Sequence, residues 1–340
     1  MPPWSPAPTF TIDFDRPWED RYDSIQGPVL DHARDLLAAI RQECPPAAVH
    51  LAPMVNLRTG GRFAAEVKAA AKHAGIEWEW LMLANVSYDL AMSQLGCSTA
   101  VLASPEGPVV ARNMDWWPEY KLAAASCLLH VTKGGRVNFS IAGWPGAIGV
   151  ATGLSARGFA LVLNAVWSDE GVSKAGYPVL LFLRKVLEDA AGFDQAVDML
   201  THEKLAAAAL LTVAGLSNDQ RVVIERTPSK ALLRRPAGDE PLLTTNHYRL
   251  LRASTQPGEG VRKYFDPTCS RYDALKSLTA PLPTGRTPTT ESLLEILSHP
   301  AVMQPITAQQ MVIRPSQASL ELFVPRRLLA GGEENVASSP

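Results

Sequence analysis

Three side chains about a third of the way along the sequence have types and spacing that suit nucleophilic catalysis. Cys97 follows a glycine, and Arg112 and Asp115 come 15 and 18 residues later. A thiol beside a guanidinium lies in a setting that favours the thiolate, which is the nucleophilic form of cysteine. The four cysteines match no zinc-ligand spacing and no CxxC pair. We therefore expect free thiols and no metal site.

The segments that carry these side chains read as the two strands of one hairpin. Residues 97–104 and 109–115 are rich in apolar and β-branched residues, and the turn sequence PEGP stands at 105–108 between them. A hairpin of this length brings the arginine and the aspartate back beside the cysteine. The pattern therefore predicts one cluster from residues that are distant in sequence.

The rest of the chain changes from helical to strand-like patterning at the cysteine. Residues 1–96 read as mostly helical, and residues 97–166 read as antiparallel hairpins with a period of two. Later helices are expected at 177–190, 193–201 and 291–298, and later strands at 210–216, 222–226, 312–315 and 320–324. The early helices are expected at 28–41, 62–73 and 77–93. This order favours an α+β fold of two antiparallel sheets with helices outside.

Composition narrows the class of protein and of partner. The chain has 340 residues, 46% hydrophobic and 19% charged, with a formal net charge of -2, which is typical of a globular enzyme. It has no basic stripe, so no nucleic-acid partner is expected. The first residues contain no signal peptide, and no run of 18 apolar residues could span a membrane. A cytoplasmic location is the resulting expectation.

Short motifs along most of the chain resemble the acid ceramidase and N-acylethanolamine acid amidase family. This family is a branch of the N-terminal-nucleophile amide hydrolases, which also include the choloylglycine hydrolases. The similar segments are Thr11–Asp15 with Arg21–Tyr22, Asn85–Asp89, Cys97–Thr99, Arg112–Asp115, Gly153–Leu154 with Leu163–Asn164, Thr245–Tyr248 and Ser270–Tyr272. Each motif is short, but their shared order is hard to explain by chance.

The resemblance implies a fold and an activation step. The fold would be a four-layer αββα sandwich, and the chain would cut itself before Cys97. Residues 1–96 would then form a mostly helical pro-segment, and residues 97–340 the catalytic domain. Cleavage would give Cys97 a free α-amino group, whose ordinary pKa of about 7.7–8.0 suits a base for its own thiol. Gly96, which has no Cβ, suits the cut because the thiol must approach the preceding carbonyl.

The same resemblance assigns roles to six residues. Cys97 would be the nucleophile and, through its amine, the base, while Asp115 would hold that amine. Arg112 would favour the thiolate or contact the carbonyl side of the substrate, and Arg271 would complete the site electrostatically. Asn164 and Asn246 would bind the oxyanion, since neutral amide N–H groups can do this. No cofactor is needed.

The resemblance implies that the substrate is a small-molecule N-acyl amide, and we expect its acyl chain to be hydrophobic. Trp116, Trp117, Trp144 and Trp167 fall beside the proposed catalytic strands and either line an acyl pocket or belong to the core. A ceramide, an N-acylethanolamine, an N-acyl amino acid, a bile-salt conjugate and a penicillin V-type side chain all remain open. The expected protein partner is the chain's own N-terminal fragment, and a homo-oligomer is also open.

Three other readings stay open at this point. A papain-like enzyme would pair Cys97 with a histidine, and His247 is the only histidine in a suggestive context. A penicillin acyltransferase-like enzyme would use the same residues but pass the acyl group to an amine instead of water. A non-catalytic binding protein of the same fold would keep none of the chemistry.

Overall fold

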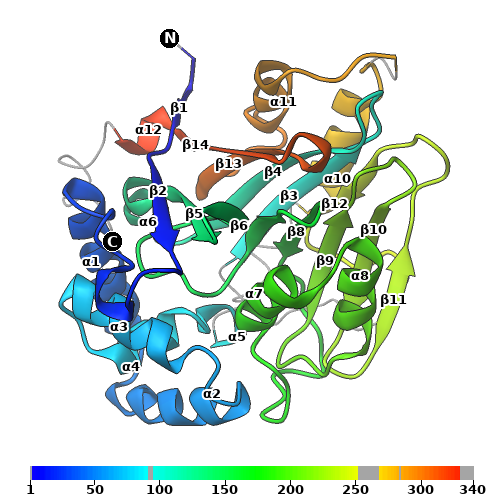
Figure 1. Ribbon diagram of the computed structural model, residues 1–340. Helices are drawn as coiled ribbons and strands as arrows, with labels where there is room; N and C mark the ends of the chain where they lie inside the picture. Colours follow the sequence, from blue (N-terminus) through cyan, green and yellow to red (C-terminus); the bar gives the residue numbers. More distant parts are fainter. Residues whose placement is uncertain (1, 91–94, 252–267, 283–284, 330–340) are drawn as a thin grey trace, which may run out of the picture.

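The computed structural model shows an α+β protein with two stacked sheets and helices on the outer face of each (Figure 1). It describes residues 2–90, 95–251, 268–282 and 285–329. Within these residues, no helix has the length and apolar character needed to cross a membrane.

The first sheet carries the hairpin that the sequence predicts around the cysteine. Its six strands, in spatial order, are β1 (Trp4–Pro6), β14 (Ser319–Pro325), β13 (Thr307–Arg314), β4 (Val109–Trp116), β3 (Leu95–Leu102) and β12 (Leu242–Thr244). All neighbouring pairs are antiparallel. The two strands of the hairpin therefore lie inside the sheet, between β13 from near the end of the chain and the edge strand β12.

The second sheet has eight strands. In spatial order they are β11 (Ala231–Arg234), β10 (Arg221–Arg226), β9 (Ala209–Ala214), β8 (Phe159–Asn164), β7 (Thr152–Ser155), β6 (Arg136–Gly143), β5 (Cys127–Lys133) and β2 (Thr9–Asp13). The expectation of purely antiparallel sheets is wrong at one edge, because β2 pairs with β5 in parallel. The long connection between these two strands makes a parallel pairing possible, whereas a tight hairpin would exclude it.

Helices complete a four-layer arrangement. The helices α7 (Val179–Asp189) and α8 (Phe193–His202) pack on the eight-stranded sheet, and α10 (Thr268–Thr279) and α11 (Thr290–Leu297) pack on the six-stranded sheet. Apolar side chains fill all three interlayer spaces, and Cys97 belongs to the cluster between the two sheets. The four-layer expectation is therefore confirmed.

The N-terminal segment is mostly helical but is not a separate unit. Its helices are α1 (Pro28–Glu43), α2 (Ala52–Arg58), α3 (Ala64–Ala74), α4 (Trp78–Ala84) and α5 (Ser87–Leu90), with 3-10 turns η1 (Trp18–Asp20) and η2 (Pro46–Leu51). In addition, β1 and β2 place this segment in both sheets. The short helices α6 (Glu119–Ala125) and α12 (Arg326–Leu329) and the turn η4 (Pro315–Gln317) complete the described elements. The division of the chain at residue 96 stays a prediction.

The helix expected over 77–93 is broken in the structure. It divides into α4 and α5 at Asn85, and residues 91–93 lie outside the described part. The side-chain amide of Asn85 donates to Leu81 O and Gly146 O, at 2.9 and 3.0 Å. Its Oδ1 accepts from the N–H groups of Ile148 and Gly149, at 2.7 and 2.8 Å. These bonds to another segment end the helix there, because they fix the backbone at a buried position.

Candidate active site

The register of the central hairpin brings the predicted nucleophile and its neighbours together. Cys97 on β3 pairs with Met114 on β4, and Gly96 pairs with Asp115. Paired residues of antiparallel strands point to the same face, so Cys97 and Met114 both face the space between the sheets. The sequence prediction that the hairpin gathers these residues is confirmed.

A fixed guanidinium lies beside the thiol. Nη2 of Arg112 donates to Sγ of Cys97 at 3.2 Å and to Leu163 O at 2.5 Å. Its Nη1 donates to Ala151 O at 2.5 Å and also to the hydroxyl of Thr152. Both Cys97 and Arg112 are buried. The strands β7 and β8 therefore hold the positive charge in place against the sulfur.

Asp115 has one satisfied oxygen and one without a hydrogen bond. Its Oδ1 accepts from the hydroxyl of Thr307 at 2.6 Å, while Oδ2 lies 3.6 Å from Nη1 of Arg271. Among the described residues, Oδ2 has no hydrogen-bond donor. Burial raises the pKa of Asp115, and Arg271, Thr307 and Arg112 oppose that rise. A Cβ placed on Gly96 would lie 2.9 Å from Oδ2, so this oxygen faces the backbone just before Cys97.

Asn246 and Arg271 hold the backbone of Cys97 from the other side. Oδ1 of Asn246 accepts from the backbone N–H of Cys97 at 3.1 Å and from Nη2 of Arg271 at 2.7 Å. Nη1 of Arg271 donates to Cys97 O at 2.7 Å and to the hydroxyl of Ser98 at 2.8 Å. Burial lowers the pKa of Arg271, and Asp115 and Cys97 oppose that shift. Both the nitrogen and the sulfur of Cys97 are thus oriented by polar side chains.

Asn164 belongs to the same network but reaches Cys97 only indirectly. Its Oδ1 accepts from the hydroxyl of Thr99 at 2.8 Å, and its Nδ2 donates to Thr244 O and Thr245 O at 3.2 and 3.1 Å. Both amide hydrogens therefore go to backbone carbonyls. In this arrangement Asn164 ties β3 and β8 to the segment that carries Asn246, and it has no N–H left for an oxyanion.

The histidine of the papain-like reading does not contact the thiol. Nδ1 of His247 lies 3.2 Å from Oγ1 of Thr245 and 3.0 Å from Oγ1 of Thr268. Burial, with the nearby Arg249 and Arg234, lowers the pKa of His247. Within the described part of the chain, no group of three or more His, Cys, Asp or Glu side chains is placed to hold a metal ion.

Two contributors escaped the sequence reading. Thr307 fixes Asp115 from β13, and nothing in its sequence context marks it. Tyr88, on α5, is fully buried, and its hydroxyl donates to Ala208 O at 2.5 Å. Burial raises the pKa of Tyr88 well above its ordinary value, and nearby Asp89, Tyr248 and Cys97 raise it further. The sequence marks Tyr88 only as part of the motif Asn85–Asp89, because tyrosines are common core residues and this one carries no further signal.

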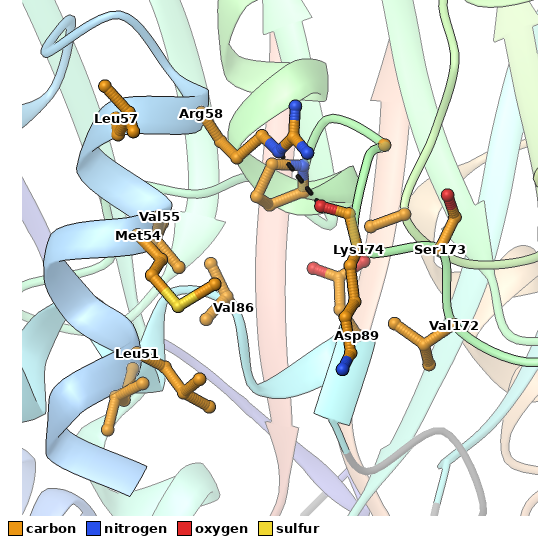
Figure 2. Close-up of a pocket in the computed structure, with 14 residues that line it drawn as sticks. Leu51, Met54, Val55, Leu57, Arg58, Val86, Asp89, Val172, Ser173 and Lys174 are labelled. Atoms are coloured by element: carbon orange, nitrogen blue, oxygen red, sulfur yellow. Dashed lines mark hydrogen bonds between the residues drawn. The ribbon is translucent and has the colours of Figure 1, made fainter.

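A large apolar cavity opens beside α5 (Figure 2). It has a volume of about 780 Å³, and its wall includes Leu51, Met54, Val86 and Val172. Asp89 lies in the same wall and follows Tyr88 in the sequence. None of the four tryptophans considered in the sequence lines this cavity. Instead, Trp116 and Trp144 pack edge-to-face, with ring centroids 6.3 Å apart.

A sequence profile of a known protein family matches more than half of the chain. The sequence profile of the acyl-coenzyme A:6-aminopenicillanic acid acyl-transferase family matches residues 102–301, which is 200 of the 340 residues. The chain belongs to this family. The match begins five residues after Cys97 and includes the other five predicted site residues.

Similar curated proteins agree with the motif-based resemblance, which is confirmed. The N-acylethanolamine-hydrolyzing acid amidase of Caenorhabditis elegans is 24% identical over 236 residues, covering 64% of this chain and 66% of that protein. The acid ceramidase of Rattus norvegicus is 22% identical over 260 residues, covering 67% and 65%. The human acid ceramidase is 24% identical over 196 residues, covering 51% and 49%. The matched part of this chain therefore spans between about half and just under two thirds of the length of these relatives.

A solved structure shares the fold. The Caenorhabditis elegans N-acylethanolamine-hydrolyzing acid amidase ortholog superposes with a TM-score of 0.52 and 23% sequence identity. The superposition covers 65% of this chain and 93% of that chain. This likeness confirms the α+β fold of two sheets in this family member.

Proposed function

We propose that this family member is a cysteine amidohydrolase that cuts its own chain at Gly96–Cys97 and then hydrolyses N-acyl amides. One observation carries the proposal: polar side chains orient both Sγ and the backbone nitrogen of Cys97. Arg112 contacts the sulfur and Asn246 contacts the nitrogen. A nucleophile that uses its own amine as base needs both atoms fixed in this way.

In the activation step, the thiol attacks the carbonyl carbon of Gly96. The C–N bond to Cys97 breaks, the nitrogen takes a proton, and the Gly96 acyl group moves to the sulfur as a thioester. Water then hydrolyses the thioester, which releases a chain ending in Gly96 and restores the thiol. Oδ2 of Asp115, which has no hydrogen-bond donor among the described residues, would accept a hydrogen bond from the new α-amino group.

In turnover, the α-amine takes the thiol proton and the sulfur attacks the carbon of the substrate amide. The leaving amine receives a proton, and the resulting thioester is hydrolysed by water to the free acid. Nδ2 of Asn246 donates one hydrogen to Ala165 O and has a second N–H. We assign the oxyanion to this N–H, and Asn164 positions the segment that carries it.

The apolar cavity supports a hydrophobic acyl chain as part of the substrate. Its volume of about 780 Å³ lies in the range of small-molecule sites. Tyr88 links the cavity wall with the core around the nucleophile: it adjoins Asp89 of the wall, and its hydroxyl donates to Ala208 O, where Ala208 and Cys97 belong to the same apolar cluster. A Val86→Asp variant should raise KM for long-chain amides much more than for acetyl amides, whereas an equal effect on both would reject this placement.

The proposed protein partner is the N-terminal fragment, which we expect to stay bound after cleavage. It contributes β1 to one sheet and β2 to the other. Glu66 on α3 also forms a buried ion pair with Arg184 on α7, at 3.0 Å. These contacts span the proposed cut and do not depend on an unbroken chain.

The test is turnover of a panel of N-acyl amides that differ in acyl chain and amine. The panel includes N-acylethanolamines, ceramides, N-acyl amino acids, bile-salt conjugates and penicillin V. We expect wild type to release acid and amine from at least one class, and Cys97→Ala to release neither. A Cys127→Ala variant is the matched control, since this buried thiol lies outside the site and burial raises its pKa. Equal activity of wild type and Cys97→Ala would reject the proposal.

The family match favours acyl transfer as the second candidate. The profile is named for a transferase that acts on 6-aminopenicillanic acid. The nucleophile and thioester would be the same, and only the acceptor would differ. Adding an amine acceptor to the assay separates the two: a transferase forms a new amide at the expense of free acid, whereas a hydrolase forms mainly acid.

A further inference from the structure

One buried carboxylate holds the residues that follow Asn246. Glu225, on β10, is fully buried. Its carboxylate accepts hydrogen bonds from three successive backbone N–H groups, those of Arg249 at 3.0 Å, Leu250 at 2.8 Å and Leu251 at 3.0 Å. Bonds from N–H groups to an ionised carboxylate are stronger than bonds between neutral groups. This segment is therefore fixed although it belongs to no helix or strand.

Neighbouring contacts tie the same segment to the sheets. The hydroxyl of Tyr248 donates to Arg226 O at 2.7 Å, so the next residue of β10 also holds the segment. Nε of Arg234 donates to Oε1 of Glu225 at 3.3 Å, and its Nη2 donates to Leu243 O at 2.9 Å. The carboxylate thus lies between the end of β12 and the residues after Asn246.

The position of Asn246 matters because its Oδ1 is shared. The same oxygen accepts from the nitrogen of Cys97 and from Arg271, at 3.1 and 2.7 Å. Asn246 is three residues before Arg249, so it lies on the short stretch between β12 and the clamped N–H groups. A displacement of that stretch would move the amide away from the nucleophile.

We propose that Glu225 is a positioning residue for Asn246. Its carboxylate clamps the N–H groups of residues 249–251 and thereby holds the Asn246 amide against the nitrogen of Cys97. The chemical step depends on Glu225 through this geometry and not through contact with substrate. This inference rests on the proposed function for the identity of the step that it affects.

The experiment compares Glu225→Gln with Glu170→Gln. Glutamine keeps the size of the side chain but turns an NH₂ group toward backbone N–H groups. Glu170 is the matched control, because it accepts from Ser229 N–H at 3.1 Å and Thr227 Oγ1 at 2.8 Å in a different loop. The measurements are hydrogen exchange at residues 249–251, the alkylation rate of Cys97, KM, and kcat normalised to the concentration of titrated Cys97 thiol.

For Glu225→Gln we expect loss of exchange protection at residues 249–251 and an altered alkylation rate of Cys97. We also expect kcat to fall about 100-fold, with a much smaller change in KM, because a misplaced group costs roughly that factor. A merely structural role would lower the yield of folded protein but leave kcat per titrated thiol unchanged. Normal kcat and alkylation in the folded variant would overturn the proposal.

Two further outcomes also test the proposal: a Glu225→Gln variant that does not fold, and a wild type without amidase activity. If Glu225→Gln does not fold, Tyr248→Phe loosens the same segment without changing a charge, and it should lower kcat in the same direction by a smaller factor. Unchanged kcat and alkylation in that variant would overturn the proposal. If wild type hydrolyses no amide, the proposed function fails, and the alkylation rate of Cys97 alone decides whether Glu225 positions Asn246.

Discussion

At the scale of single residues, Cys97 lies beside buried charges of both signs. Arg112 and Arg271 are both buried and carry two positive charges against the single carboxylate of Asp115. Buried charges are costly unless they are balanced. A thiolate on Cys97, 3.2 Å from Arg112, would bring this group of four side chains to neutrality.

Replacing Gly96 with alanine tests how closely the cut site is packed. A Cβ at this position would lie 2.9 Å from Oδ2 and 3.1 Å from Cβ of Asp115, so either residue 96 or the Asp115 side chain must shift. We expect Gly96→Ala to fold but to cleave its chain about 10- to 100-fold more slowly, because the attacking thiol and the carbonyl are misaligned. The measurement is the time course of fragment formation, with Gly285→Ala, where the added Cβ meets no atom, as control. Cleavage at the wild-type rate would contradict this packing argument.

Replacing His247 separates the proposed mechanism from a cysteine–histidine pair. Its ring contacts two threonine hydroxyls and not the thiol. We expect His247→Ala to keep kcat within about tenfold of wild type, whereas loss of a general base typically costs 10²–10⁴-fold. The pH dependence of kcat/KM is measured alongside, and loss of its acidic limb together with most activity would favour the histidine as general base.

The site was predictable from sequence where side chains lie on one hairpin, and less so elsewhere. Hairpin geometry alone places Arg112 and Asp115 beside Cys97, so spacing was enough. For Asn164 the family resemblance suggested an oxyanion donor, but the three-dimensional contacts direct both of its N–H bonds to carbonyls. Thr307 lies 192 residues from Asp115 in sequence, and no local pattern could connect the two.

At the scale of elements, the stability contributed by the contact between α5 and α7 should depend on pH. Asp89 on α5 accepts from the N–H of Val179, the first residue of α7, at 3.1 and 3.3 Å. Burial raises the pKa of Asp89 to about 7, and the Val179 N–H opposes that rise. In the unfolded chain an aspartate titrates near 3.9. The folded state therefore holds this proton at pH values where the unfolded state has lost it.

The sign of the pH effect follows from this difference. Below about pH 4 the buried carboxyl makes its full contribution to stability. This contribution falls by on the order of 4 kcal/mol as pH rises to about 7 and the folded state loses the proton. We expect the unfolding free energy of wild type, relative to Asp89→Asn, to fall between pH 5 and 7 and to level off near pH 8. Urea unfolding at several pH values measures this, with the exposed Asp35→Asn as control. A difference that stays constant with pH would contradict the assignment.

Most element types were readable from periodicity, and the misses have physical causes. The strand β13 begins at Thr307, five residues before the predicted start at Val312. Its first residues are polar but buried, and Gln309 and Gln310 donate hydrogen bonds to Ser126 and Asn113 at 2.7 and 3.2 Å. A hydrophobic pattern cannot show a strand whose buried side chains are polar and paired.

At the scale of the whole molecule, the N-terminal segment is part of the fold. Its strands extend one sheet at β14 and the other at β5. Arg62, two residues before the start of α3, adds ion pairs with Glu188 and Asp189, at 2.6 and 2.5 Å. The helical character of residues 1–96 was readable from sequence, but the parallel β2–β5 pairing was not, because sequence patterns carry no partner information for edge strands.

The buried ion pair between Glu66 and Arg184 gives a direct test of fragment retention. Removing one partner of a buried pair typically costs about 3–5 kcal/mol, and Glu188 remains near Arg184 at 2.8 Å as a partial substitute. We therefore expect Glu66→Gln to lose about 3 kcal/mol of stability and to release the N-terminal fragment from the cleaved protein at lower urea concentrations. Size-exclusion chromatography in urea measures the release.

The matched control is Glu77→Gln in the same segment. Glu77 forms an exposed pair with Arg41 at 3.6 Å, and exposed pairs contribute about 0–1 kcal/mol. Equal release of the fragment from both variants would show that the buried pair does not hold the two parts together. Release of the fragment from wild type in plain buffer would contradict the retention of residues 2–90 as part of the fold.

The central claim is that Cys97 becomes an N-terminal nucleophile, and the intact mass of the purified protein tests it most directly. Wild type and Cys97→Ala are incubated from acidic to neutral pH and then weighed by mass spectrometry. The account predicts two fragments for wild type, one of them beginning at Cys97, and a single uncut chain for the variant. A wild-type chain that stays whole while it hydrolyses an N-acyl amide would contradict the account, as would a Cys97→Ala chain cut at the same bond.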